Sequence, residues 1–121
     1  MPHVAPPSTR YLGRVVGNGH CVAYVREMAG LGHTSTWTAG GPVRDTGCKS
    51  GTAIATFDPN GLYGNHTDGR SHAAILVEET PDGLKVTDQW VGHPVQGRLI
   101  RFKGGKGKPC DDGDAYRVIE A

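Results

Sequence analysis

Only one segment of this chain has the periodicity of an α-helix, and this limits the possible folds more than any other feature. Between Asn18 and Ala29 the apolar residues recur about every fourth position, which places them on one helical face. Asn18 is a suitable N-cap, and Gly30 can close the other end of the helix. A lone amphipathic helix must bury its apolar face against another layer of structure. The segments that follow therefore decide the fold.

These following segments have the pattern of short β-strands separated by turns. Strand patterns occupy 52–57, 72–78, 84–90, 98–102 and 115–119. The stretch 31–51 reads as a loop with room for one short helix, and the 19 Gly and 8 Pro residues favour short elements joined by turns. We predict a single α+β domain over 1–121, with an irregular N-terminal arm over 1–12. Its helix packs on a small antiparallel sheet of about five strands.

The charge balance argues against nucleic acid as the main partner. The chain has 13 basic and 12 acidic residues, so its net charge is +1 and it has no strong basic field. No apolar run approaches the roughly 18 residues of a membrane helix, so membrane insertion is not expected. The segment Met1 to Arg10 is polar and lacks the hydrophobic stretch of a signal peptide. Two possibilities stay open: export by a route other than general secretion, or a mature form whose signal has been removed.

Cys21 lies where a glycine-rich turn becomes the predicted helix. A helix N-terminus has unpaired N–H groups and partial positive charge, and both favour the thiolate that attacks carbonyl carbons. The Cys21 N–H is also available as an oxyanion donor. The alternative is a small buried hydrophobe, which is what most free cysteines are.

Two further residues suit a cysteine hydrolase. His72 opens an apolar strand, where its imidazole can take the thiol proton and later protonate a leaving amine. Asp88 lies near the end of the next strand and can fix the His72 tautomer. We predict Cys21, His72 and Asp88 as nucleophile, base and orienting acid. Gln89 is an alternative third member, but strand alternation puts it on the face opposite Asp88. An ordinary strand-end histidine and a solvated edge aspartate are the competing interpretations.

Three aromatic residues and a second histidine are candidates for contact with substrate. Trp37, Trp90 and Tyr63 can form the wall of a cleft, although aromatic residues are more often part of a core. His20, beside Cys21, is a candidate second donor to the oxyanion. No cofactor or metal is expected, because the chain lacks a C-x-x-C or H-x-x-x-H pair.

The other two cysteines, Cys48 and Cys110, each lie in a turn-like segment. With 3 cysteines, at least one is unpaired in a monomer. We predict a Cys48–Cys110 disulfide that leaves Cys21 free. The closed loop of about 60 residues would stabilise the fold by roughly 4 kcal/mol in the chain-entropy model. The alternative is two separate reduced cysteines at the surface.

Several sequence blocks, taken in order, resemble the second family of type VI secretion amidase effectors. These are small papain-like amidases of the NlpC/CHAP superfamily, and domesticated relatives occur in animals, ticks among them. The blocks are V-V-G-N-G-H-C-V-A-Y-V (15–25), G-T-A-I-A-T-F (51–57), S-H-A-A-I-L-V (71–77), V-T-D-Q-W (86–90) and D-G-D-A-Y-R-V-I (112–119). The resemblance covers nearly the whole chain after Gly13. By its motifs, the nucleophile is Cys21, the base His72 and the third polar residue Asp88.

The resemblance implies a papain-like fold and a peptidoglycan substrate. The implied reaction is hydrolysis of a wall peptide bond, and members of this branch are associated with the D-Ala–meso-diaminopimelate cross-link. It further implies a secreted antibacterial toxin that acts in the periplasm or at the wall of target bacteria. A monomer and a cognate immunity protein that blocks the cleft around Cys21 are also expected. The alternatives are a cysteine hydrolase or deamidase acting on protein, and a non-catalytic wall-binding module.

Overall fold

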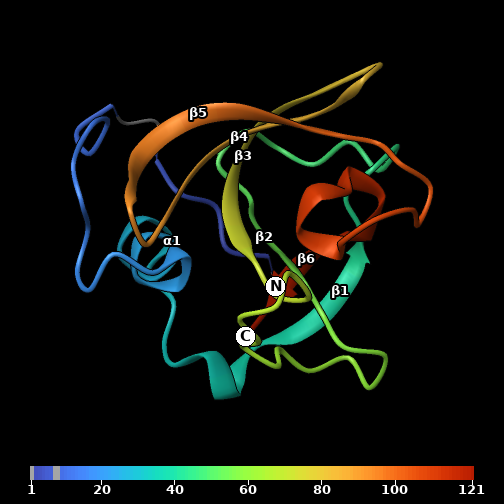
Figure 1. Ribbon diagram of the computed structural model, residues 1–121, viewed down its shortest axis with the longest axis horizontal. Coiled ribbons are helices and arrows are strands. Elements are labelled where there is room, and N and C mark those ends of the chain that lie inside the picture. The colour runs from blue at the N-terminus through green and yellow to red at the C-terminus, as the bar shows by residue number, and fades with distance from the viewer. Residues whose placement is uncertain (1, 7–8) are drawn as a thin grey trace.

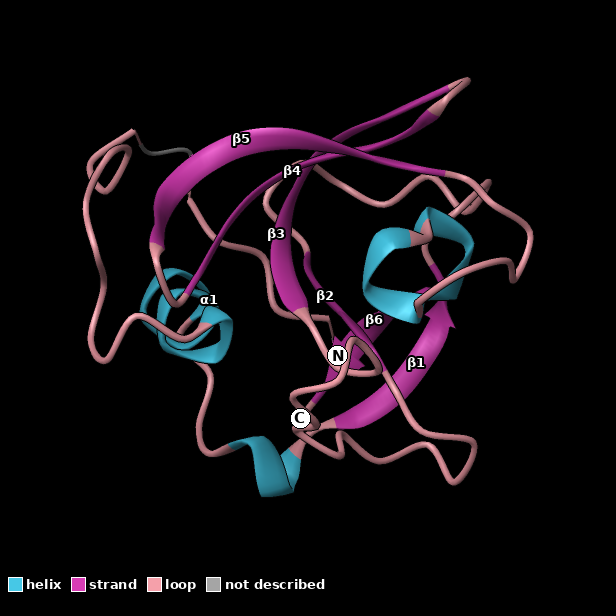
Figure 2. Ribbon diagram, in the orientation of Figure 1, coloured by secondary structure: helices cyan, strands magenta, loops and turns pink. Residues whose placement is uncertain are grey.

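The computed structural model describes residues 2–6 and 9–121, and it combines one α-helix with one antiparallel sheet (Figures 1 and 2). The helix is α1 (Cys21–Ala29), and the sheet has 6 strands in the order β1-β6-β2-β3-β4-β5. The strands are β1 (Thr38–Pro42), β2 (Ala53–Thr56), β3 (Ala73–Thr80), β4 (Gly83–Trp90), β5 (His93–Arg101) and β6 (Tyr116–Glu120). Three short 3₁₀ helices are η1 (Thr34–Thr36), η2 (Pro109–Asp111) and η3 (Gly113–Ala115). The predicted α+β class is confirmed.

The sheet curves strongly, so that α1 and the η2–η3 segment lie on opposite sides of β3 (Figure 1). Side chains alternate along the central strands between two buried clusters. Ala53, Ala55 and Ala73 belong to the cluster that includes the α1 residue Val25. The helix packs against β3 and β4 on this side of the sheet. Ile54 and its neighbours on the other face form the second cluster.

The helix begins three residues later than its sequence pattern predicts. Its N-cap is His20, and the Asn18 side chain accepts the His20 N–H at 3.1 Å instead of capping the first turn. Gly30 ends the helix as predicted, with φ of 67° and its N–H bonded to the Arg26 carbonyl. Cys21 is therefore the first helical residue. None of the described helices is long and apolar enough to cross a membrane.

The strand β1 was not predicted, because its sequence T-A-G-G-P has no strand alternation and most of it is exposed. It is an edge strand of the sheet beside β6, where Gly and Pro are tolerated, and one isolated bridge also joins Thr38 to Leu62. Gly40 sits at the register shift of this pair, where a Cβ atom would lie 2.9 Å from the Val118 carbonyl oxygen. β5 is also longer than predicted, since a two-residue turn at 91–92 lets it begin at His93.

The predicted Cys48–Cys110 disulfide is absent from the structure, in which both cysteines are free. The two thiols belong to different parts of the fold. Cys48 packs against the second buried cluster, and its Sγ lies 3.3 Å from the Thr46 hydroxyl oxygen. Cys110 lies in η2 and lines a pocket next to His72. Shared turn character thus did not indicate proximity.

Candidate active site

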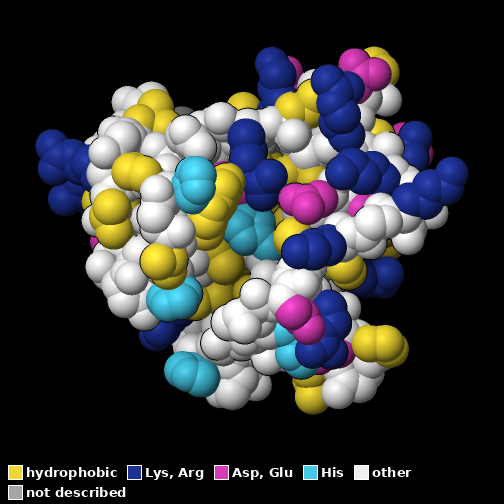
Figure 3. Space-filling model, in the orientation of Figure 1, with side chains coloured by type: hydrophobic (Ala, Val, Ile, Leu, Met, Phe, Trp, Pro, Cys, Tyr) yellow, Lys and Arg dark blue, Asp and Glu magenta, His cyan; other side chains and the backbone are white. Residues whose placement is uncertain are grey.

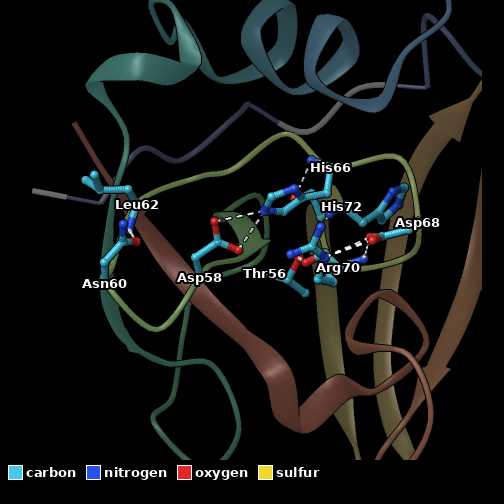
Figure 4. Close-up of polar contacts among 9 residues, drawn as sticks. Thr56, Asp58, Asn60, Leu62, His66, Asp68, Arg70 and His72 are labelled. Carbon is cyan, nitrogen blue, oxygen red and sulfur yellow. Dashed lines mark hydrogen bonds and ion pairs between the residues drawn. The ribbon is translucent and has the colours of Figure 1, made fainter.

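The start of β3 is fixed to the end of β2, and this positions His72. The His72 N–H donates to the Thr56 hydroxyl at 3.0 Å, and the Thr56 N–H donates to the His72 carbonyl at 3.0 Å. The Thr56 hydroxyl in turn donates to the Arg70 carbonyl at 2.9 Å, so it also holds the incoming loop (Figure 4). The N–H and the carbonyl of His72 are therefore both held by hydrogen bonds to Thr56.

The His72 ring is held by a buried carboxylate. His72 Nε2 lies 2.7 Å from Asp88 Oδ2, and the two residues are 6% and 0% exposed. Arg98 Nε donates to the same oxygen at 2.8 Å, which stabilises the carboxylate charge. Because Nε2 is engaged by Asp88, Nδ1 is the ring nitrogen available to Cys21. The structure thus brings together the three residues predicted from sequence.

The electrostatics of Cys21 and His72 favour a thiolate–imidazolium pair. Burial raises the pKa of the Cys21 thiol, but the hydrogen bond and charge of His72, with the Ala73 N–H, lower it below its usual value. Burial lowers the pKa of His72, whereas hydrogen bonds and negative charge from Asp88 and Cys21 raise it to about 9. No acidic residue occupies the first turn of α1, so nothing there offsets its positive end. Both shifts favour the charged form of the pair.

Tyr63 adds a hydroxyl beside the nucleophile. Its Oη lies 3.7 Å from Cys21 Sγ, and its ring packs against Trp37 and Phe57 with centroid distances of 5.2 and 6.2 Å. Burial and the charge of Cys21 raise the pKa of Tyr63 well above its usual value, so the hydroxyl keeps its proton. It is available as a hydrogen-bond donor to sulfur or to substrate. Sequence reasoning placed Tyr63 only in a cleft wall.

The loop that carries Tyr63 toward the site is braced by a hydrogen bond between its two limbs (Figure 4). His66 Nε2 lies 2.9 Å from Asp58 Oδ2, and the His66 N–H donates to the Ser71 hydroxyl at 2.8 Å. Gly64 passes directly over this pair, where a Cβ atom would lie 2.3 Å from Asp58 Oδ2. The bracing therefore depends on glycine at this position.

Gln89 supports the nucleophile from the opposite side of β4. Its Oε1 accepts the Val16 N–H at 2.8 Å, and its Nε2 donates to the Val16 and His20 carbonyls at 2.8 Å each. The side chain is fully buried and makes these bonds with the turn just before Cys21. As strand alternation predicts, Gln89 and Asp88 point to opposite faces of β4 and contact different residues. Gln89 is thus a positioning residue, and Asp88 is the residue that contacts His72.

We expect Gln89→Leu to lower the free energy of unfolding by about 2–4 kcal/mol, because two buried backbone groups of Val16 and the part-buried His20 carbonyl lose their partner. Gln96→Leu is the matched control, since Gln96 is exposed on β5 opposite Asp88. It should change stability by no more than about 0.5 kcal/mol. Chemical denaturation followed by circular dichroism measures both values. Equal midpoints for the two variants would show that Gln89 does not hold this turn.

The remaining predicted contact residues separate into different environments. Trp37 is fully buried and its Nε1 donates to the Gly32 carbonyl at 3.2 Å, so its predicted place in the cleft wall is wrong. Trp90 lies beside His72, with the rings edge to face and their centroids 6.2 Å apart. His20 is exposed and its side chain makes no capping hydrogen bond. Its predicted role as an oxyanion donor stays a prediction.

A hollow of about 370 Å³ adjoins His72 between the 67–71 loop, β5 and η2. In Figure 3, Lys and Arg side chains gather on the side of the molecule where the η2–η3 segment lies, and few lie over α1. Among residues 2–6 and 9–121, no three His, Cys, Asp or Glu side chains form a group that could hold a metal ion.

A sequence model of the domesticated amidase effector 2 family matches residues 4–119. The chain belongs to this family. Over 113 residues it is 39% identical to domesticated amidase effector 2 of Ixodes scapularis, which covers 87% of this chain and 73% of that protein. Its fold also matches a solved type 6 secretion amidase effector 2, with a TM-score of 0.73 and 32% identity over 88% of this chain and 84% of the other.

Membership of the domesticated amidase effector 2 family confirms the resemblance drawn from the sequence blocks and the papain-like fold. At family level the protein is an amidase effector, related to effectors of type VI secretion. The match begins at residue 4, well before the first block recognised in the sequence. This earlier start agrees with the pairing of Val4 to Thr52, which ties the N-terminal arm to the domain.

Proposed function

We propose that this protein is a cysteine amidase that hydrolyses peptide bonds of bacterial peptidoglycan. The observation that carries the proposal is the Cys21–His72–Asp88 arrangement in a member of an amidase effector family, with His72 Nε2 2.7 Å from Asp88 Oδ2. The lowered pKa of Cys21 and the raised pKa of His72 support a thiolate nucleophile. Cys21 attacks, His72 transfers protons, and Asp88 holds the imidazolium.

In the first half-reaction, the Cys21 thiolate attacks the amide carbonyl carbon and the carbonyl oxygen gains the negative charge. The Cys21 N–H, at the first helical position where no intrahelical acceptor exists, donates to this oxygen. The His72 imidazolium gives its proton to the amide nitrogen, and the C–N bond breaks. The amine departs and an acyl thioester remains on Cys21.

In the second half-reaction, neutral His72 removes a proton from water, and the hydroxide attacks the thioester carbonyl. The C–S bond breaks and releases a carboxylic acid, which loses its proton to solvent, and the Cys21 thiolate is restored beside the His72 imidazolium. Asp88 holds the ring in one orientation through both steps, and Arg98 holds Asp88. No cofactor is needed for this cycle.

The preferred bond in this proposal is the D-Ala–meso-diaminopimelate cross-link, as the sequence resemblance implies. The protein then acts as a monomeric antibacterial toxin in the periplasm or at the wall of target bacteria. Where it serves as an effector, a cognate immunity protein would cover the cleft around Cys21.

Defined muropeptides test the bond assignment. We expect the protein to convert a D-Ala–meso-diaminopimelate cross-linked dimer into its two monomers without shortening either stem, as read by mass spectrometry. Cleavage within the stem instead would contradict the assigned bond. Hydrolysis of protein amides, with no effect on muropeptides, would favour the alternative of a protein-directed hydrolase.

A further inference from the structure

The pocket beside His72 extends away from the nucleophile. Its lining includes His72, Trp90, Arg98 and Asp111, and no residue of α1. The pocket is also lined by Cys110 and Asp111 of η2, and in Figure 1 the η2–η3 segment lies across β3 from α1. In the proposed reaction His72 protonates the departing nitrogen, so the pocket adjoins the amine side of the scissile bond. Groups on the amine-side residue of the substrate are therefore the ones that reach it.

Arg98 lines this pocket, and its guanidinium group is held in place by two neighbouring residues. Its Nε is committed to Asp88 at 2.8 Å, and its Cζ lies 5.0 Å from the centroid of the Trp90 ring. These two contacts fix the guanidinium plane, yet 24% of the side chain is exposed. The Nη groups donate no hydrogen bond to any residue within 2–6 and 9–121. A planar pair of free N–H donors matches the two oxygens of a carboxylate.

Asp111 limits which anion can bind there. Its carboxylate lines the same pocket and lies close enough for its charge to act on Arg98. Within the described chain, Asp88 is the carboxylate in ion-pair contact with Arg98. Any anion bound to Arg98 meets repulsion from Asp111, and a group with two negative charges meets about twice the repulsion of a single carboxylate. The pocket is thus suited to a carboxylate more than to a phosphate.

We propose that this pocket is a carboxylate-binding subsite, in which Arg98 binds a free carboxylate on the residue that supplies the scissile nitrogen. This inference rests on the proposed amidase function and specifies its substrate class. In the D-Ala–meso-diaminopimelate cross-link, the carbon next to the scissile nitrogen carries such a carboxylate. Arg98 therefore has two contacts: Asp88 on its inner side and the substrate on its outer side.

Two synthetic cross-linked peptides test the subsite. They are identical except that the carboxylate next to the scissile nitrogen is free in one and amidated in the other. For the wild-type protein, we expect the KM of the amidated peptide to be about 10- to 100-fold higher, the size expected for one charge-assisted pair of hydrogen bonds. The kcat values should agree within about threefold, because the contact exists before the chemical step.

The variants separate recognition from structural support. Arg98→Gln should bring the ratio of the two KM values close to 1, and Arg98→Lys should give an intermediate ratio because it keeps the charge without the planar fork. Arg101→Gln is the matched control, since Arg101 is exposed on the same strand and does not line the pocket. It should keep the wild-type ratio. A merely structural role for Arg98 would weaken both peptides equally and leave the ratio unchanged, which would overturn the subsite.

Binding to the Cys21→Ala protein provides a readout that does not depend on catalysis. Titration calorimetry should give Kd values for the two peptides that differ by the same factor of about 10 to 100. Equal Kd values would overturn the subsite whatever the activity of the wild-type protein. Unequal Kd values with no cleavage of either peptide by the wild type would support the subsite and contradict the proposed amidase function.

Discussion

Replacing Cys21 by alanine should lower kcat/KM for a cross-linked muropeptide dimer by about 10⁴-fold or more, because no other group can form the acyl intermediate. Cys21→Ser should be similarly impaired, since an alkoxide is not formed at neutral pH by the electrostatics that produce a thiolate. The melting temperature should change by no more than about 5 °C, because Cys21 is only partly buried.

Cys48→Ala is the matched control for the loss of a thiol. Cys48 lies in a pocket with Pro42, Thr46 and Val118, away from His72, so its removal should leave kcat/KM within about twofold of wild type. Burial and the charge of Asp111 raise the pKa of the remaining thiol, Cys110, which makes it a poor substitute nucleophile. Residual activity of Cys21→Ala at even a tenth of the wild-type rate would exclude Cys21 as the nucleophile.

Replacing Asp88 should have the second largest effect, through the pKa of His72. The pair is reactive while Cys21 is ionised and His72 is protonated, so the alkaline limb of kcat/KM reports the His72 pKa of about 9. Without the Asp88 charge, that pKa falls toward the ordinary value of about 6.5, and the alkaline limb moves to lower pH. We expect Asp88→Ala to lower kcat/KM at pH 7 by about 10³-fold.

Asp88→Asn serves as the conservative comparison. Its amide oxygen can still accept a hydrogen bond from His72, so the ring keeps its orientation but loses the stabilising charge. We expect a loss of about 10- to 100-fold at pH 7 and the same direction of shift in the alkaline limb. An alkaline limb that stays near pH 9 in both variants would contradict this origin of the raised His72 pKa.

The parts of the site that sequence could predict are those fixed by local pattern. The helical period located α1, and the positions of His72 and Asp88 at strand ends brought them within reach of the helix N-terminus. Gly30 closed the helix as expected because a left-handed residue was required there. The second buried face of the sheet also follows from alternation along the strands.

Residues missed by sequence reasoning depend on register and on loop paths. Arg98 reaches Asp88 because the two-residue turn at 91–92 and a register shift place Gln96 opposite Asp88. Pairing the residues of the two strands outward from this turn places Arg98 close to Asp88, so the sequence could have indicated this contact. Tyr63 was a candidate for the cleft wall, but nothing in the sequence indicated that its hydroxyl reaches Cys21, because this approach depends on how the 58–70 loop folds. The predicted Cys48–Cys110 disulfide, which the structure does not contain, rested on turn composition, and turn composition does not fix which turns meet.

Digestion of purified sacculi by the wild-type protein and by Cys21→Ala, followed by mass spectrometry of the fragments, tests the central claim most directly. The account predicts that the wild type removes cross-linked dimers and creates new free amines, while sacculi treated with Cys21→Ala keep their cross-links. Sacculi left unchanged by the wild type, or degraded equally by both proteins, would contradict a cysteine amidase acting on peptidoglycan.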